Sequence, residues 1–171
     1  GFRGMYLTKC LENVKENAPT RFGLFVNIDW EQIDAPDFLE NNLTILRDAK
    51  LAGAIGLKVY KGLGLTDTDS SGKRIAVNDP RLDPIWAACG VLGFPVLIHS
   101  AEPASFWKPK DKFNERWLEL KQKPGRYRDP AKVPSFESII AEQHDIFRKN
   151  PGTTFINAHM GWMANDLDRL G

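Results

Sequence analysis

Four short apolar runs alternate with helical patterns along the 171-residue chain, and this alternation restricts the fold more than any other feature. The runs are rich in Val, Ile, Leu and Phe with little polar alternation, as in strands that are covered on both faces. They occupy residues 22–29, 55–60, 94–99 and 153–159. Because regular helix–strand alternation indicates a parallel sheet with right-handed crossovers, we expect an α/β fold.

A helical pattern precedes each strand, and capping residues mark several of the helix ends. The patterns span residues 5–17, 37–52, 80–92 and 135–149. Asp79 before Pro80 and Ser135 have the character of N-caps. Asp37 and Glu40 have the spacing of a capping box, which predicts the start of the second helix.

The connections between these elements are unequal in length. Helix-to-strand links are minimal, as at Gly93, whereas residues 61–78 and 100–134 form long strand-to-helix loops. Such loops gather at the carboxyl edge of a parallel sheet, where active sites lie, and long loops within a domain are usually functional. We therefore expect residues 100–134 to form an active-site loop or lid, in which the aromatic Trp107 and Trp117 cover the site, anchor the loop in a small hydrophobic cluster, or do both.

Two of the three histidines end a strand. His99 closes the run FPVLIH and His159 closes TTFINAH, so both belong to the carboxyl edge of the sheet. Histidine is the commonest metal ligand and the usual general base near neutral pH. A core histidine bonded to the backbone is the alternative for each, but two of them beside long loops favour a site. His144 lies within a helix between polar neighbours, and we expect it on the surface.

Charged residues near the strand ends are further candidates. Lys58 interrupts an apolar strand, where a lysine is costly to bury unless it is paired or used. It could contact an acidic substrate, bridge metals when carbamylated, or pass the strand end into solvent. We expect Lys61 to be solvated, and we expect Asp29 and Glu102 to cap helices rather than bind a ligand.

Composition argues against several classes of partner. A net charge of +1, with 26% charged residues, gives no electrostatic case for a nucleic-acid or membrane partner. No apolar stretch approaches the length of a membrane span. Cys10 and Cys89 lie in helical patterns without a Cys-x-x-Cys motif, which predicts reduced packing residues in a cytoplasmic protein.

The segments GAIGLKVYKGL, PVLIHSAEP and INAHMGW, in this order and spacing, resemble the amidohydrolase superfamily. The resemblance is to its amidohydrolase-related branch, which includes enzymes like aminocarboxymuconate-semialdehyde decarboxylase, and it covers roughly residues 20–171. It implies a (β/α)8 TIM barrel that binds a divalent metal, often zinc. Residues 1–171 would then form a single domain, an incomplete barrel of about four parallel strands, the third to the sixth.

The resemblance also implies roles for three residues. His99 matches the fifth-strand histidine that ligates the metal, and His159 matches the sixth-strand histidine that orients or deprotonates metal-bound water, or ligates a second metal. Lys58 falls on the fourth strand, where some branches carry a carbamylated lysine between two metals. The first-strand His-x-His and the eighth-strand aspartate have no counterpart here. Because the chain lacks an initial methionine and both its ends look cut, we expect a piece of a longer enzyme that is inactive alone.

Three functions are considered for the full-length protein, of which we favour the first, with the second close behind. The first is a metal-dependent hydrolase, in which metal-activated water attacks an amide, ester or lactone. The second is a metal-dependent non-oxidative decarboxylase of an unsaturated or aromatic acid. The third is a non-catalytic α/β binding domain whose histidines are structural. We expect a small-molecule partner, an organic acid or amide, and leave a homo-oligomer open.

Overall fold

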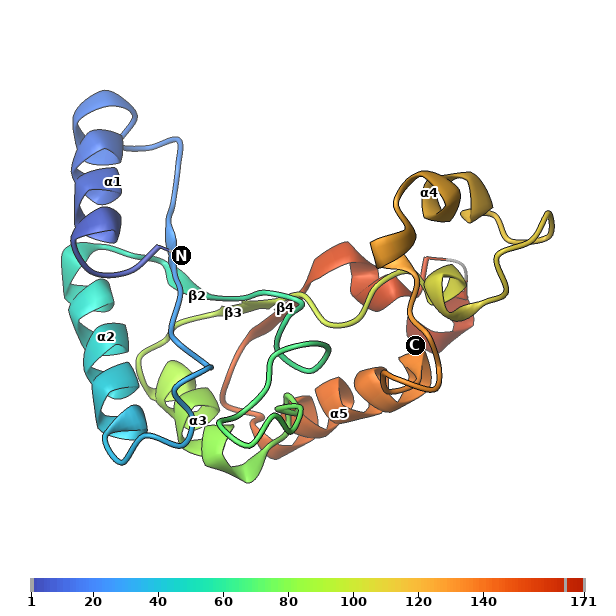
Figure 1. Ribbon diagram of the computed structural model, residues 1–171. Helices are drawn as coiled ribbons and strands as arrows, with labels where there is room; N and C mark the ends of the chain where they lie inside the picture. Colours follow the sequence, from blue (N-terminus) through green and yellow to red (C-terminus); the bar gives the residue numbers. More distant parts are fainter. Residues whose placement is uncertain (1, 165, 171) are drawn as a thin grey trace.

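The structure is a computed structural model that describes residues 2–164 and 166–170 (Figure 1). Within these residues, four parallel strands form one sheet in the order β1-β2-β3-β4. The strands are β1 (Phe25–Val26), β2 (Gly56–Val59), β3 (Val96–Ile98) and β4 (Phe155–Asn157). Strands that follow one another in the chain are therefore neighbours in the sheet. This order confirms the expected α/β fold and is that of part of a TIM barrel.

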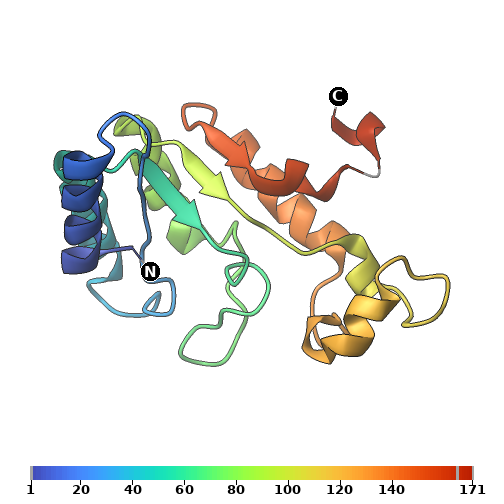
Figure 2. The same ribbon diagram turned by 90° about the horizontal axis from the view of Figure 1, so that it is seen from above.

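Helices connect the strands and cover one face of the sheet (Figures 1 and 2). The helices are α1 (Gly4–Asn17), α2 (Phe38–Ala52), α3 (Asp83–Val91), α4 (Trp117–Gln122) and α5 (Phe136–Lys149). Alternate strand residues such as Leu57 and Val96 are fully buried in the same cluster as Leu46 of α2 and Trp86 of α3. The residue that follows each of them on its strand, Lys58 in β2 and Leu97 in β3, lies on the opposite face of the sheet and is only partly buried.

The long loops lie where the sequence predicts them. In Figure 2 the arrowheads of β2 and β3 point toward the segments that follow each strand, residues 60–79 and 99–135. The second loop contains α4, and a hydrophobic cluster separate from the main core lies at its base. That cluster consists of Leu65, Ala101, Phe136, Ile139, Ile140 and Met163. The loop therefore rests on a cluster supplied mainly by α5 and by the segments that follow β2 and β4.

Two local predictions need correction. β1 is much shorter than residues 22–29, because the Asn27 backbone N–H donates to the carbonyl oxygen of Phe2 (2.9 Å), outside the sheet. The side chain of Asn27 instead donates to the backbone oxygen of Lys58 (2.9 Å). The capping box at Asp37 is wrong: its carboxylate accepts a bond from the Asn41 side chain (2.7 Å) and none from the backbone of the first turn.

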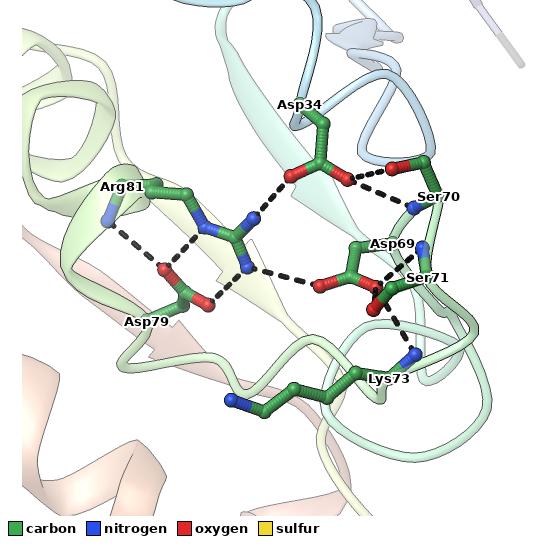
Figure 3. Close-up of polar contacts among 7 residues, drawn as sticks. All are labelled: Asp34, Asp69, Ser70, Ser71, Lys73, Asp79 and Arg81. Carbon is green, nitrogen blue, oxygen red and sulfur yellow. Dashed lines mark hydrogen bonds and ion pairs between the residues drawn. The ribbon is translucent and has the colours of Figure 1, made fainter.

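Arg81 joins the loops that follow β1 and β2, and Figure 3 shows its guanidinium group between three carboxylates. It lies 2.5 Å from Asp34, 2.7 Å from Asp79 and 3.6 Å from Asp69. Asp34 also accepts bonds from the backbone nitrogen (2.8 Å) and hydroxyl (2.6 Å) of Ser70. We call this group of five residues the Arg81 clamp, because it ties residue 34, the turn at 69–70 and the start of the third helical segment together.

The remaining sequence predictions concern single residues. Cys10 and Cys89 are free thiols, and burial raises the pKa of Cys89 to about 12, which makes it unreactive. His144 is partly buried near the ring of Phe147, with centroids 6.0 Å apart, so its expected surface position is wrong. None of the described helices has the length and apolar character needed to cross a bilayer.

Candidate active site

The structure brings His99 and His159 together. β3 and β4 are paired neighbours, and each histidine follows the end of its strand, so both leave the carboxyl edge of the sheet side by side. Their ring centroids are 4.5 Å apart, and the ring planes meet at 65°. A single atom or small group can therefore contact both imidazole rings.

His99 presents a buried and unused ring nitrogen. Its backbone nitrogen donates to the carbonyl oxygen of Val59 (3.1 Å), but its Nε2 has no hydrogen-bond partner among the described residues. Burial, followed by the positive charges of His159 and Lys58, lowers the pKa of His99 to about 4. The ring is therefore neutral at pH 7, which is the form that ligates a metal.

His159 lies on an unusual backbone turn. His159, Met160, Gly161 and Trp162 are all in the left-handed region, with φ values of 57°, 53°, 60° and 61°. This conformation costs roughly 1–2 kcal/mol for each residue that carries a Cβ. At Gly161 a Cβ would lie 2.4 Å from the side-chain nitrogen of Asn157, so only glycine fits there. The turn places the His159 ring in an exposed position at the edge of the site.

Trp162 stacks on the His159 ring and also lies near His99, with ring centroids 5.7 Å apart. The stacked rings of Trp162 and His159 have centroids 4.5 Å apart and an interplanar angle of 18°. The indole nitrogen of Trp162 donates to the backbone oxygen of Ser100 (2.9 Å), the residue after His99. Trp162 therefore connects the two histidine-bearing segments. The sequence analysis did not single it out, although its place in the motif INAHMGW, three residues after His159, was a usable signal.

Glu102 has a different role from the predicted helix cap. It is only 4% exposed, and its Oε1 accepts bonds from Lys61 Nζ (2.6 Å) and from Nη2 of Arg128 (2.9 Å). Lys61 is exposed, as predicted, but it also forms this ion pair, which the sequence did not predict. Asp29 is not a cap either, because its carboxylate pairs with Arg3 (2.9 Å).

Lys58 is partly buried on the open face of the sheet, beside the histidines. Its Nζ donates to the backbone oxygen of Val59 (2.5 Å) and lies 4.9 Å from the centroid of the Tyr60 ring. Within the described residues, no carboxylate lies at ion-pair distance from it. Burial lowers the pKa of Lys58 to about 8, which increases the share of neutral amine at neutral pH.

A cavity of about 350 Å³ adjoins His159. The loop at 100–134 supplies one wall, and α5 and the segment after β4 supply the others. Its lining includes Ser105, Lys108, Arg116, Phe136, His159 and Trp162. The expected lid residues do not line it: Trp107 donates its indole N–H to the oxygen of Pro134 (2.8 Å) and anchors the loop, and Trp117 begins α4.

The described residues could supply part of a metal site. Nowhere in residues 2–164 and 166–170 do three or more His, Cys, Asp or Glu side chains gather as a metal cluster. The orphaned Nε2 of the neutral His99 nevertheless fits a metal ligand, and His159 is close enough to act on the same centre. Further ligands would have to come from outside these residues.

Sequential parallel strands in one sheet, with long loops at their carboxyl edge, have the arrangement of part of a TIM barrel. A family model described as Amidohydrolase matches residues 15–170, so the chain belongs to the amidohydrolase family. None of the curated proteins matches the chain.

Solved structures share the fold. The 2,6-dihydroxybenzoate decarboxylase from Rhizobium matches with a TM-score of 0.57 and 18% identity, over 95% of this chain and 46% of that chain. The same enzyme complexed with 2,6-dihydroxybenzoate matches with a TM-score of 0.58, 18% identity and the same coverage. Metarhizium anisopliae IDCase in apo form matches with a TM-score of 0.59 and 17% identity, over 94% of this chain and 38% of that chain. The chain thus spans less than half the length of these proteins.

Proposed function

We propose that the full-length protein is a metal-dependent decarboxylase of a small organic acid. The observation that carries the proposal is the contact of His99 with His159, in which Nε2 of a neutral, partly buried imidazole has no protein partner. Membership of the amidohydrolase family indicates an enzyme, which counts against a non-catalytic binding domain. A decarboxylase in this fold, whose structure is known with 2,6-dihydroxybenzoate, supports an acid as substrate.

The roles of the residues follow from their surroundings. A divalent metal at His99 would supply Lewis acidity toward an oxygen of the substrate. In a decarboxylation the bond to the carboxyl carbon breaks, CO2 leaves, and the remaining carbon takes up a proton. His159 is exposed and lies beside His99, so its imidazole can deliver that proton. Lys58 adds positive charge near an anionic substrate. Zinc as the metal and a cytoplasmic location remain parts of this proposal.

Hydrolysis is the second candidate, and the exposure of His159 favours it. An imidazole that is open to solvent can accept a proton from water as the water attacks an amide, ester or lactone carbon. The same two histidines serve both reactions. The difference between them therefore lies in the substrate.

The test is an assay of the full-length enzyme with zinc or manganese bound. CO2 release from 2,6-dihydroxybenzoate and other aromatic acids is compared with hydrolysis of a panel of amides, esters and lactones. We expect CO2 release that chelation and His159→Ala both abolish, while His144→Ala, a histidine remote from the pair, stays active. Hydrolysis without CO2 release would show that the enzyme is a hydrolase and not a decarboxylase. Absence of both activities in the metal-loaded enzyme would overturn both candidates.

A further inference from the structure

Buried polar atoms without partners are concentrated at His99 and in the loop that follows it. Within the described residues, five buried side-chain atoms lack a hydrogen-bond partner, and four of these lie at His99 and in the loop that follows it. The four atoms are His99 Nε2, Ser100 Oγ, Ser105 Oγ and Arg128 Nε. Because buried polar groups are nearly always paired in folded proteins, this concentration marks a place that a polar ligand completes.

Arg128 is the charged member of this set. It lies in the limb of the loop that returns from α4 to α5, and its backbone nitrogen donates to the oxygen of Phe106 (2.9 Å). Its Nη2 donates to Glu102 Oε1 (2.9 Å), while its Nε is unused. Lys61, from the loop after β2, binds the same oxygen of Glu102 (2.6 Å). A single carboxylate oxygen therefore holds two cations from different loops.

Around Glu102 the positive charges outnumber the negative ones. Glu102 offers one negative charge to two positive charges, and nearby Lys58 adds a third without a described carboxylate partner. An excess of positive charge in a partly desolvated place is costly unless an anion neutralises it. The side chain of Lys61 is 46% exposed, so an incoming ligand can reach this end of the group from solvent, whereas Arg128, 15% exposed, lies deeper.

We propose that Arg128 and Lys61, held in place by Glu102, form the subsite that binds the carboxylate of the substrate. The proposal rests on the proposed function and extends it by naming the residues that select an acid. A guanidinium group presents parallel N–H donors that match the two oxygens of a carboxylate, and lysine adds a point charge. The substrate class is thus a small organic acid with one carboxylate next to the group that His99 and His159 contact.

The experiment measures equilibrium binding to the full-length, metal-loaded enzyme. Benzoate is the anionic probe, and benzamide is its neutral counterpart of similar shape. Arg128→Gln should weaken benzoate binding by about tenfold or more, the effect of losing one charge-assisted hydrogen bond, and leave benzamide binding unchanged. Arg128→Lys keeps the positive charge but loses the paired N–H donors of the guanidinium group, so its affinity for benzoate should lie between those of the wild type and Arg128→Gln. Lys61→Gln should also weaken benzoate binding and provides a test at a more exposed position.

Lys132→Gln is the matched control, because Lys132 lies on the same loop with its side chain 80% exposed and paired only with Asp129 at 3.8 Å. It should leave both affinities unaltered. Benzoate affinity equal to wild type in folded Arg128→Gln and Lys61→Gln would overturn the proposal. Equal loss for benzoate and benzamide would also overturn it, because a structural defect does not distinguish charge. Binding is measured without turnover, so a failure of decarboxylation alone would leave the subsite intact.

Discussion

At the scale of single residues, His99 and His159 differ in solvent exposure, and the roles that we propose for them follow from this difference. His99 is partly buried with an orphaned nitrogen, whereas His159 is exposed and stacked on Trp162. We expect His99→Ala to lower metal content and turnover together, because a ligand is lost. His159→Ala should keep the metal and lose about 10²–10⁴-fold in turnover, the range for loss of a general acid or base. Metal content per protomer measured alongside kcat distinguishes the two, and full metal with normal rate in both variants would contradict the assignment.

Lys58 provides a prediction about stability. Its folded pKa of about 8 lies below the ordinary value of 10.5, so the unfolded chain holds the proton more tightly between these values. The cost of burying the charge is therefore fully present below pH 8 and disappears as the pH rises through 10.5. Lys58→Met should raise Tm by a few degrees at pH 7 and by less at pH 10. Equal shifts at both pH values would contradict this explanation, and a loss of metal in the same variant would support a bridging lysine.

Trp162 is predicted to act as a positioning residue for His159. Trp162→Phe keeps a ring against the imidazole but loses the bond to Ser100, whereas Trp162→Ala loses both. We expect about a tenfold lower kcat for the alanine variant, most of which phenylalanine restores, because misplacing a proton-transfer group is costly. Steady-state kinetics and metal analysis test this expectation. Trp117→Ala is the control, and equal defects in the Phe and Ala variants would contradict the stacking role.

At the scale of elements, the Arg81 clamp makes acid sensitivity testable. Hydrogen bonds from Ser70 and Ser71 lower the pKa values of Asp34 and Asp69, and the bond from Arg81 lowers that of Asp79. Lowered carboxyl pKa values contribute stability that is present above the unfolded value of 3.8 and is lost as the pH falls through the folded values.

Arg81→Ala should therefore reduce stability at pH 6 and make its decline between pH 6 and pH 3 shallower. Urea unfolding at the two pH values measures this difference. Arg148→Ala removes an arginine of similar charge that is 72% exposed and 3.9 Å from its partner Asp145, and it should change little. An Arg81 variant with unchanged acid dependence would show that the clamp does not couple these loops.

The elements also show what the sequence can predict. The apolar runs predict the strands and their parallel order, because burial on both faces of a strand is encoded in neighbouring residues. The difference in length between strand-to-helix and helix-to-strand loops predicts which edge of the sheet is the carboxyl edge with the site. His99 and His159 could be found for the same reason, since each directly follows such a run. Arg128 and Glu102 are 26 positions apart, and their contact depends on the path of an irregular loop. No local pattern predicts such a pair.

At the scale of the whole molecule, one face of the sheet carries the helices and the other is open. The open face includes Ile156, 43% exposed, and the partly buried Leu97, which is its register partner in the sheet. Inward-facing side chains fill the interior of a TIM barrel, so these residues are expected to be covered in the full-length enzyme. The 171-residue chain alone should therefore bind a hydrophobic dye and self-associate.

Ile156→Lys should have opposite effects in the isolated 171-residue chain and in the full-length enzyme. In the isolated chain it should reduce dye binding and association, because a charge replaces exposed apolar surface. In the full-length enzyme it should lower Tm, because the same charge would be buried. Leu51→Lys, at an outer helix position that is 86% exposed, is the control and should leave Tm unaltered in both. A full-length Ile156→Lys variant with the wild-type Tm would show that this face stays open.

The separate hydrophobic cluster under the long loop has a consequence for how such enzymes diverge. The sheet and α2 and α3 share one cluster, while the base of the loop at 100–134 belongs to another. Substitutions in the cavity wall therefore leave the larger cluster unaltered, and natural selection can change what the cavity accepts without rebuilding the barrel. New substrate preferences can therefore arise in this family through changes in the loop at 100–134, while the packing between the sheet, α2 and α3 stays the same.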